Sequence, residues 1–201
     1  MKTLLVFVIL FAITTFFVHI PASAQEVTAT PSVDPEVMIP LQATPIITME
    51  NKEIQYDLPY PGILPDNPLY FLKVIRDKVQ EFFITDPLQR AVFDVMQSDK
   101  RMNASVSLSE EKPENTALIS STVSKALNYF EESISQTKQA KQQGEDIKNF
   151  ASHMDTASLK YRQLILQLQT KSTAALKSDL EGDKSRIDSL HATVVSLEDS
   201  K

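Results

Sequence analysis

From Leu69 onward, apolar residues recur at intervals of three or four positions, and polar residues fill the intervals. The first stretch with this period predicts an amphipathic helix over residues 68–84. Its apolar stripe, which we expect to enter a core, consists of Leu69, Leu72, Ile75, Val79, Phe82 and Phe83. Asn67 is expected to cap this helix with its side-chain oxygen, and Pro68 suits the first helical position because no N–H is needed there.

Three further segments carry the same period. Asp86 and Pro87 fit the start of a second helix that ends within residues 109–113, and a third helix is predicted over 116–143. Gly144 suits the left-handed residue that closes a helix. The fourth helix has the clearest seam, with alternating steps of three and four, at Ile147, Phe150, Met154, Ala157, Tyr161, Leu164 and Leu168.

An apolar stripe continues from Leu176 to Leu197, shifted in phase against the fourth helix. The chain therefore either runs on as one long helix or breaks, and we favour a break or kink at Gly182-Asp183. Short connections between the earlier helices require antiparallel neighbours. The sequence thus predicts an all-α domain over residues 58–201, an up-and-down antiparallel bundle of three to four long helices.

The first 57 residues have a different character. Residues 1–24 predict a signal peptide, because a charged start and an uncharged apolar run precede the small residues Ala22 and Ala24. Cleavage is favoured over a retained anchor. Residues 25–57 are rich in Pro and Thr, and their charged residues are mostly acidic. This composition predicts a disordered flexible linker rather than a ligand for a proline-binding groove.

Charge and composition exclude several classes of function. The net charge is −6, and loss of Lys2 with the predicted signal peptide leaves −7, so we expect no nucleic-acid partner. Without cysteine there is no disulfide, thiol chemistry or thiolate metal site. His153 and His191 are expected at the surface, and no sequence motif for a nucleophile, a metal or a phosphate is present. We therefore expect no catalytic residue, no metal ligand and no cofactor, and the chain is not predicted to be an enzyme.

The stretch from Leu64 to Lys73 resembles the motif L-P-x-S/N-P-L-Y-x-L-K of the bacterial domain-of-unknown-function family 5667. The matching residues are Leu64, Pro65, Asn67, Pro68, Leu69, Tyr70, Leu72 and Lys73. The basic residue that usually follows the lysine is displaced, since Val74 stands there and Arg76 comes later. The resemblance covers residues 58–169 and implies a helical domain outside the cytoplasm, with no assigned activity.

Two interpretations of this motif remain. It is a structural clasp in which Leu69 and Leu72 enter the core and Tyr70 fixes the entering chain, or Tyr70 and Lys73 form a recognition patch; we favour the clasp, with Lys73 exposed. The predicted function is a non-catalytic binding or structural module in the periplasm, at the cell surface or secreted. Its partner would be an envelope or extracellular protein, with no integral membrane span after signal cleavage. The alternative is a periplasmic helical chaperone or metal-responsive accessory protein.

Overall fold

The computed structural model describes residues 54–199, which belong to one compact unit. The predicted signal peptide and most of the predicted linker lie outside the described residues. Within 54–199 there are helices and no strand, which confirms the all-α class. The helices are α2 (Tyr70–Phe83), α3 (Pro87–Glu111), α4 (Thr116–Gln142), α5 (Lys148–Lys171) and α6 (Ala174–Asp199).

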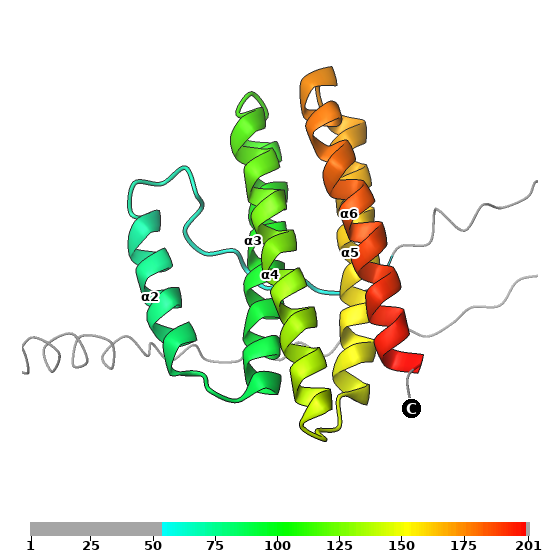
Figure 1. Cartoon of the computed structure of the whole chain (residues 1–201). Coiled ribbons are helices and arrows are strands. Elements are labelled where there is room, and N and C mark those ends of the chain that lie inside the picture. The colour runs from blue at the N-terminus through cyan, green and yellow to red at the C-terminus, as the bar shows by residue number, and fades with distance from the viewer. Residues whose placement is uncertain (1–53, 200–201) are drawn as a thin grey trace, which may run out of the picture. The chain divides into compact units, whose positions relative to one another are not determined.

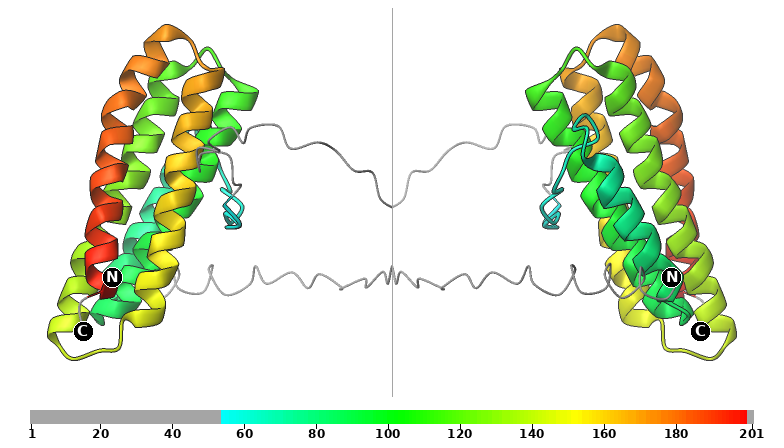
Figure 2. Two further views of the ribbon diagram at one scale, coloured as in Figure 1. Left: turned by 90° about the vertical axis from the view of Figure 1, so that its right-hand side faces the viewer. Right: turned by 90° about the vertical axis from the view of Figure 1, so that its left-hand side faces the viewer.

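Helices α3 to α6 form a four-helix bundle (Figures 1 and 2). α3 packs on α4 and α5, and α6 packs on α4 and α5, so that each helix of the bundle has two neighbours. Each successive pair is joined by a short connection, which makes these neighbours antiparallel, as predicted. α2 belongs to none of these closely packed pairs and stands beside α3, apart from the bundle (Figure 1).

The core of the bundle is formed by apolar residues of all four helices, α3 to α6, and it includes most of the predicted seam of the fourth helix. Phe130 of α4 and Tyr161 of α5 are fully buried, and their rings meet edge to face with centroids 5.2 Å apart. The predicted seam of the fourth helix is buried except for Phe150, which is half-buried against the core. Two helix boundaries are also confirmed. Asp86 Oδ1 accepts a hydrogen bond from Gln89 N at 2.7 Å, and Gly144 has φ +88°.

The expected break at Gly182-Asp183 is wrong, because Gly182 lies inside α6 and the chain turns back at Ser172-Thr173. Ser172 is extended, with ψ 163°, and the Thr173 carbonyl accepts a hydrogen bond from Lys177 N at 3.0 Å. The Thr173 hydroxyl lies 3.5 Å from Leu176 N, where a helix cap is placed. The phase shift in the apolar stripe therefore marks the start of a new antiparallel helix.

Candidate functional site

The chain reaches α2 through residues 54–69, here called the entering segment, which runs across the bundle without regular secondary structure (Figure 1). Polar side chains of the bundle hold its backbone. Lys160 Nζ donates to Ile54 O at 3.1 Å, and Asn103 Nδ2 donates to Pro59 O at 2.9 Å. α5 and α3 thus fix the path of the segment before it enters α2.

A buried polar network also ties the entering segment to the core. The Tyr56 hydroxyl lies 2.9 and 3.0 Å from the two carboxylate oxygens of Asp99, and Tyr161 Oη donates to Asp99 Oδ1 at 2.6 Å. Burial raises the pKa of Asp99, while the two tyrosine hydrogen bonds act to lower it. Tyr56, which the sequence analysis did not single out, therefore has the fastening role that had been expected of Tyr70.

The motif residues are only partly placed as predicted. Leu64 and Pro65 are half-buried, and Leu64 packs against the core. Asn67 Oδ1 accepts a hydrogen bond from Leu69 N at 2.8 Å, and Asn67 O accepts one from Tyr70 N at 2.9 Å. Asn67 and Pro68 are exposed and form a turn, so that the helix begins at Tyr70, two residues later than predicted.

The expectation that Leu69 and Leu72 enter the core is wrong, since both are more than half exposed. The expectation that Lys73 is exposed is also wrong. Lys73 is buried, and its Nζ donates to Pro61 O at 2.6 Å and lies 5.5 Å from the centroid of the half-buried Tyr70 ring. Burial, followed by the nearby Arg101 guanidinium, lowers the pKa of Lys73 to about 8.

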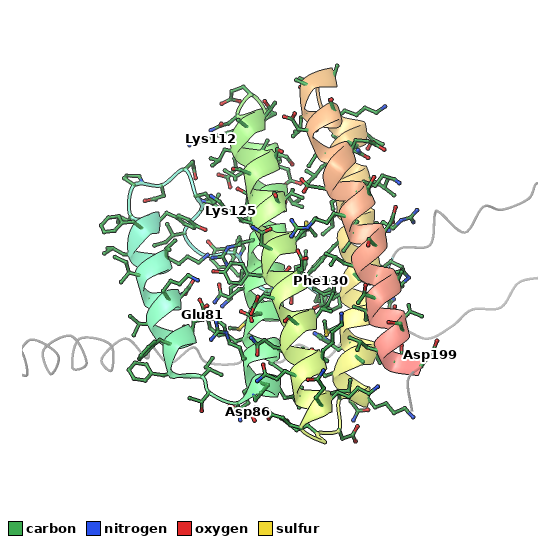
Figure 3. All side chains as sticks on the ribbon, viewed as in Figure 1. Glu81, Asp86, Lys112, Lys125, Phe130 and Asp199 are labelled. Carbon is green, nitrogen blue, oxygen red and sulfur yellow. The ribbon has the colours of Figure 1, made fainter. Side chains whose placement is uncertain are left out.

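The inner side of α2, which faces α3, carries the charged residues Lys73, Asp77 and Glu81. Asp77 is buried and accepts a hydrogen bond from Arg76 at 2.7 Å, and Glu81 forms an ion pair with Arg90 of α3. Figure 3 shows Glu81 between the two helices. Asp94 of α3 is buried beside them, with neither carboxylate oxygen hydrogen-bonded, and burial raises its pKa to about 7. α2 is therefore attached to the bundle by charged and polar groups.

The outer side of α2 is apolar and faces solvent. This outer face consists of Phe71, Leu72, Ile75, Val79, Phe82 and Phe83, all of them exposed. A shallow hollow along it is lined by Val74, Ile75, Lys78, Val79, Phe82 and Phe83. The sequence predicted this stripe almost residue for residue, but it assigned the stripe to the core, whereas the structure leaves it uncovered.

One cluster has the composition of a hydrolase triad without its geometry. Ser158 Oγ lies 2.9 Å from His191 Nδ1, and Asp155 Oδ1 lies 3.2 Å from the same nitrogen. A triad requires the carboxylate and the hydroxyl on opposite ring nitrogens. In addition, Ser158 is fully buried and donates to Asp155 O at 2.6 Å, so its proton is already engaged. His153 is exposed as expected, while His191 is half-buried.

Within residues 54–199, no group of three or more His, Cys, Asp or Glu is arranged to hold a metal ion. No helix in that range is long and apolar enough to cross a membrane. The arrangement that the described residues do provide is a helix held on the bundle by its polar side, with its apolar side exposed.

Comparison with known proteins gives one match. No curated protein and no solved structure matches the chain significantly. The family described as Domain of unknown function (DUF5667) matches residues 62–157, a range that begins in the entering segment and ends in α5. The matched range contains the whole motif from Leu64 to Lys73, all of α2, and the α3–α4 hairpin against which α2 is held. The match over residues 62–157 confirms the resemblance to the DUF5667 family that the motif indicated.

Proposed function

We propose that the chain is an exported, non-catalytic binding module that presents the outer face of α2 to a helical protein partner in the cell envelope or the extracellular space. The signal-like residues 1–24 support export, because a charged start, an apolar run and small residues before the cut occur in the order that signal peptidase requires. The linker composition of residues 25–57 supports a flexible N-terminal extension ahead of the helical module.

The exposed outer face of α2 is the single observation that carries the binding role. Globular proteins place single apolar residues on their surface, but a contiguous apolar patch marks an interaction site. Leu72, Ile75, Val79 and Phe82 follow one another at steps of three, four and three. This is the spacing with which one helix packs its side chains between those of another. A partner helix is therefore the shape that suits this face.

The attachment of α2 supports the same role. Lys73, Asp77 and Glu81 occupy the inner side, so the outer face is turned away from the bundle and no other described residue needs to move to expose it. The entering segment fixes the start of α2, and the Arg90–Glu81 ion pair fixes its end. The four-helix bundle then acts as a rigid base for the exposed helix.

The proposal is tested by site-specific crosslinking in the producing cell. A photoreactive benzoylphenylalanine replaces Phe82 on the outer face, and in the control it replaces Val195 of α6, which is also exposed. We expect a discrete protein adduct from position 82 and none from position 195. Cell fractionation should find the product outside the cytoplasm, with a mass that shows removal of residues 1–24. Equal crosslinking at both positions, or a cytoplasmic product, would refute the proposal.

A further inference from the structure

The size of the outer face indicates what covers it. The exposed fractions are 56% for Phe71, 51% for Leu72, 56% for Ile75, 47% for Val79, 80% for Phe82 and 70% for Phe83. A free Phe side chain presents about 150–250 Å² and an aliphatic side chain somewhat less, so these fractions leave roughly 600–700 Å² of mostly apolar surface on one helix side. The largest patch on a monomeric protein is about 300–600 Å². One partner in a stable protein complex buries about 800 Å².

The charges at the edges of the face distinguish between possible occupants. Arg76 and Lys78 flank the apolar stripe, one on each edge. Arg76 is paired with Asp77 at 2.7 Å and Lys78 with Glu81 at 2.8 Å, so each edge cation lies beside a carboxylate of the same helix. This pairing weakens both the attraction to anionic lipid and the repulsion between two identical helices. The net charge of −6 further disfavours an anionic lipid surface.

The spacing of the apolar residues on the outer face allows α2 to pair with α2 of a second copy of the chain. Along α2, Leu72 and Val79 alternate with Ile75 and Phe82 as the two seam positions of a coiled coil. The bundle lies on the opposite side, against Lys73 and Asp77, so two copies can bring their α2 helices together while their bundles stay apart. A two-fold pair uses the same patch on both copies and therefore covers both apolar faces at once.

We propose that the outer face of α2 pairs with the outer face of α2 in a second copy of this chain, forming a two-fold dimer. The proposal rests on the function proposed above and identifies the helical partner as a second copy. The dimer interface consists of the seam from Leu72 to Phe82, with Phe71 and Phe83 at its edges.

Sedimentation of the full-length chain, purified as the producing cell processes it, is the first test. The wild type should sediment as a dimer at micromolar concentration, and Ile75→Asp should raise the dimer dissociation constant at least about 30-fold. The matched control is Val195→Asp, which makes the same change at an exposed apolar position of α6 and should leave the dimer intact. Circular dichroism should show unchanged helix content in both variants, since neither side chain is in the core.

Cysteine crosslinking gives an independent test, because the chain contains no cysteine of its own. Val79→Cys should form a disulfide with itself if the two helices are parallel. If they are antiparallel, an equal mixture of Ile75→Cys and Val79→Cys should form a mixed disulfide. Either product supports the dimer, while Val195→Cys should stay monomeric under the same oxidation. If neither seam experiment gives a disulfide, the pairing is refuted.

The outcomes separate this inference from the function on which it rests. A wild type that stays monomeric, with position 82 crosslinking to a different protein, overturns the dimer and leaves the binding module standing. A monomer that co-sediments with phosphatidylcholine–phosphatidylglycerol vesicles, and loses this binding in Ile75→Asp, makes lipid the occupant and overturns both. A monomer with neither adduct nor vesicle binding also overturns both.

Discussion

Replacing Asp94 by Asn should remove a large part of the pH dependence of stability. Asp94 is 1% exposed, and both of its carboxylate oxygens are buried without a hydrogen-bond partner. The nearest cation is Arg90, whose Nε lies 3.5 Å from Asp94 Oδ2. The Arg90 guanidinium donates to Glu81 instead, which leaves Asp94 only a weak electrostatic contact. Ionisation of the Asp94 carboxyl group in the folded protein therefore costs free energy.

The magnitude follows from the shift in pKa. Burial, reinforced by Glu81 and Glu132 and opposed by Arg90, raises the pKa of Asp94 from 3.8 to about 7. Between these values the folded chain binds more protons than the unfolded chain, so the free energy of unfolding falls as pH rises and is constant above about pH 7. At 1.36 kcal/mol per pKa unit the whole range is worth roughly 4 kcal/mol. The interval from pH 5 to 8 spans about two of these units and contributes about 2–3 kcal/mol.

Urea unfolding at pH 5 and pH 8, followed by circular dichroism, measures this contribution. The wild type should lose about 2–3 kcal/mol more than Asp94→Asn between the two pH values. Asp94→Asn should accordingly be the more stable of the two at pH 8. Asp179→Asn, a control at an exposed carboxylate of α6, should follow the wild type. If Asp94→Asn shows the same pH dependence as the wild type, Asp94 is adequately solvated or paired and the reasoning is refuted.

Four further substitutions test the packing and the backbone. Gly62 has φ +72°, so Gly62→Ala should lower the free energy of unfolding by about 1–2 kcal/mol. Gly182→Ala should raise the free energy of unfolding by up to about 1 kcal/mol, because Gly182 lies within α6 and an added Cβ meets nothing within 4 Å. Thermal melts compare the two variants, and a shift of the melting temperature in the same direction for both would contradict these backbone conformations. Phe130→Ala should cost about 3–5 kcal/mol in urea titration, and a cost below 1 kcal/mol would contradict its burial in the core. Tyr161→Phe removes the hydrogen bond to Asp99 and should cost about 1.5–3 kcal/mol in the same titration; wild-type stability would show that this hydrogen bond contributes little.

The helices of the bundle could be predicted because the residues that begin and end them agreed with the spacing of the apolar residues between those ends. Asp86 and Gly144 mark helix ends by their own chemistry, and the seam from Ile147 to Leu168 has a period that only a helix places on one side. The turn at Ser172-Thr173 was missed since it carries neither glycine nor proline. A hydroxyl cap is a weaker signal than Gly182, which turned out to have no structural role as a helix end.

The placement of α2 could not be derived from its own period. Periodicity shows that a helix has two sides, but it does not show which side meets the rest of the protein. The sequence of α3 did contain a feature related to this placement. Its polar residues Arg90, Asp94, Gln97 and Arg101 follow one another at steps of four, three and four, which puts them on one side of the helix. Such a polar stripe on a helix is usually assigned to solvent. Here Asp94, Gln97 and Arg101 are buried, and Arg101 stacks on the Tyr129 ring at 4.1 Å from its centroid.

The entering segment, rather than α3, provides the hydrogen-bond partner of the buried motif lysine. Lys73 was expected to be exposed because long charged side chains rarely enter a core. Its ammonium group, however, donates to the Pro61 carbonyl at 2.6 Å, and Gly62, with φ +72°, allows the turn that brings this oxygen there. Within the motif, Leu64 packs on the core and Lys73 is buried, whereas Asn67 lies in the turn before the Leu69 N-cap and Leu69 and Leu72 are exposed.

The exposed outer face and the polar inner contacts of α2 together favour pairing with a second copy of the chain. At about 25 cal/mol per Å², the uncovered outer face corresponds to about 15 kcal/mol as an upper bound. Each inner hydrogen bond or ion pair contributes only about 1–3 kcal/mol. Turning α2 to bury the apolar side would break the Lys73–Pro61 hydrogen bond and the Glu81–Arg90 ion pair, and it would leave Arg90 of α3 without its Glu81 partner. A second α2 laid on the outer face removes apolar surface from water and keeps every inner contact, which neither orientation of α2 achieves in a single chain.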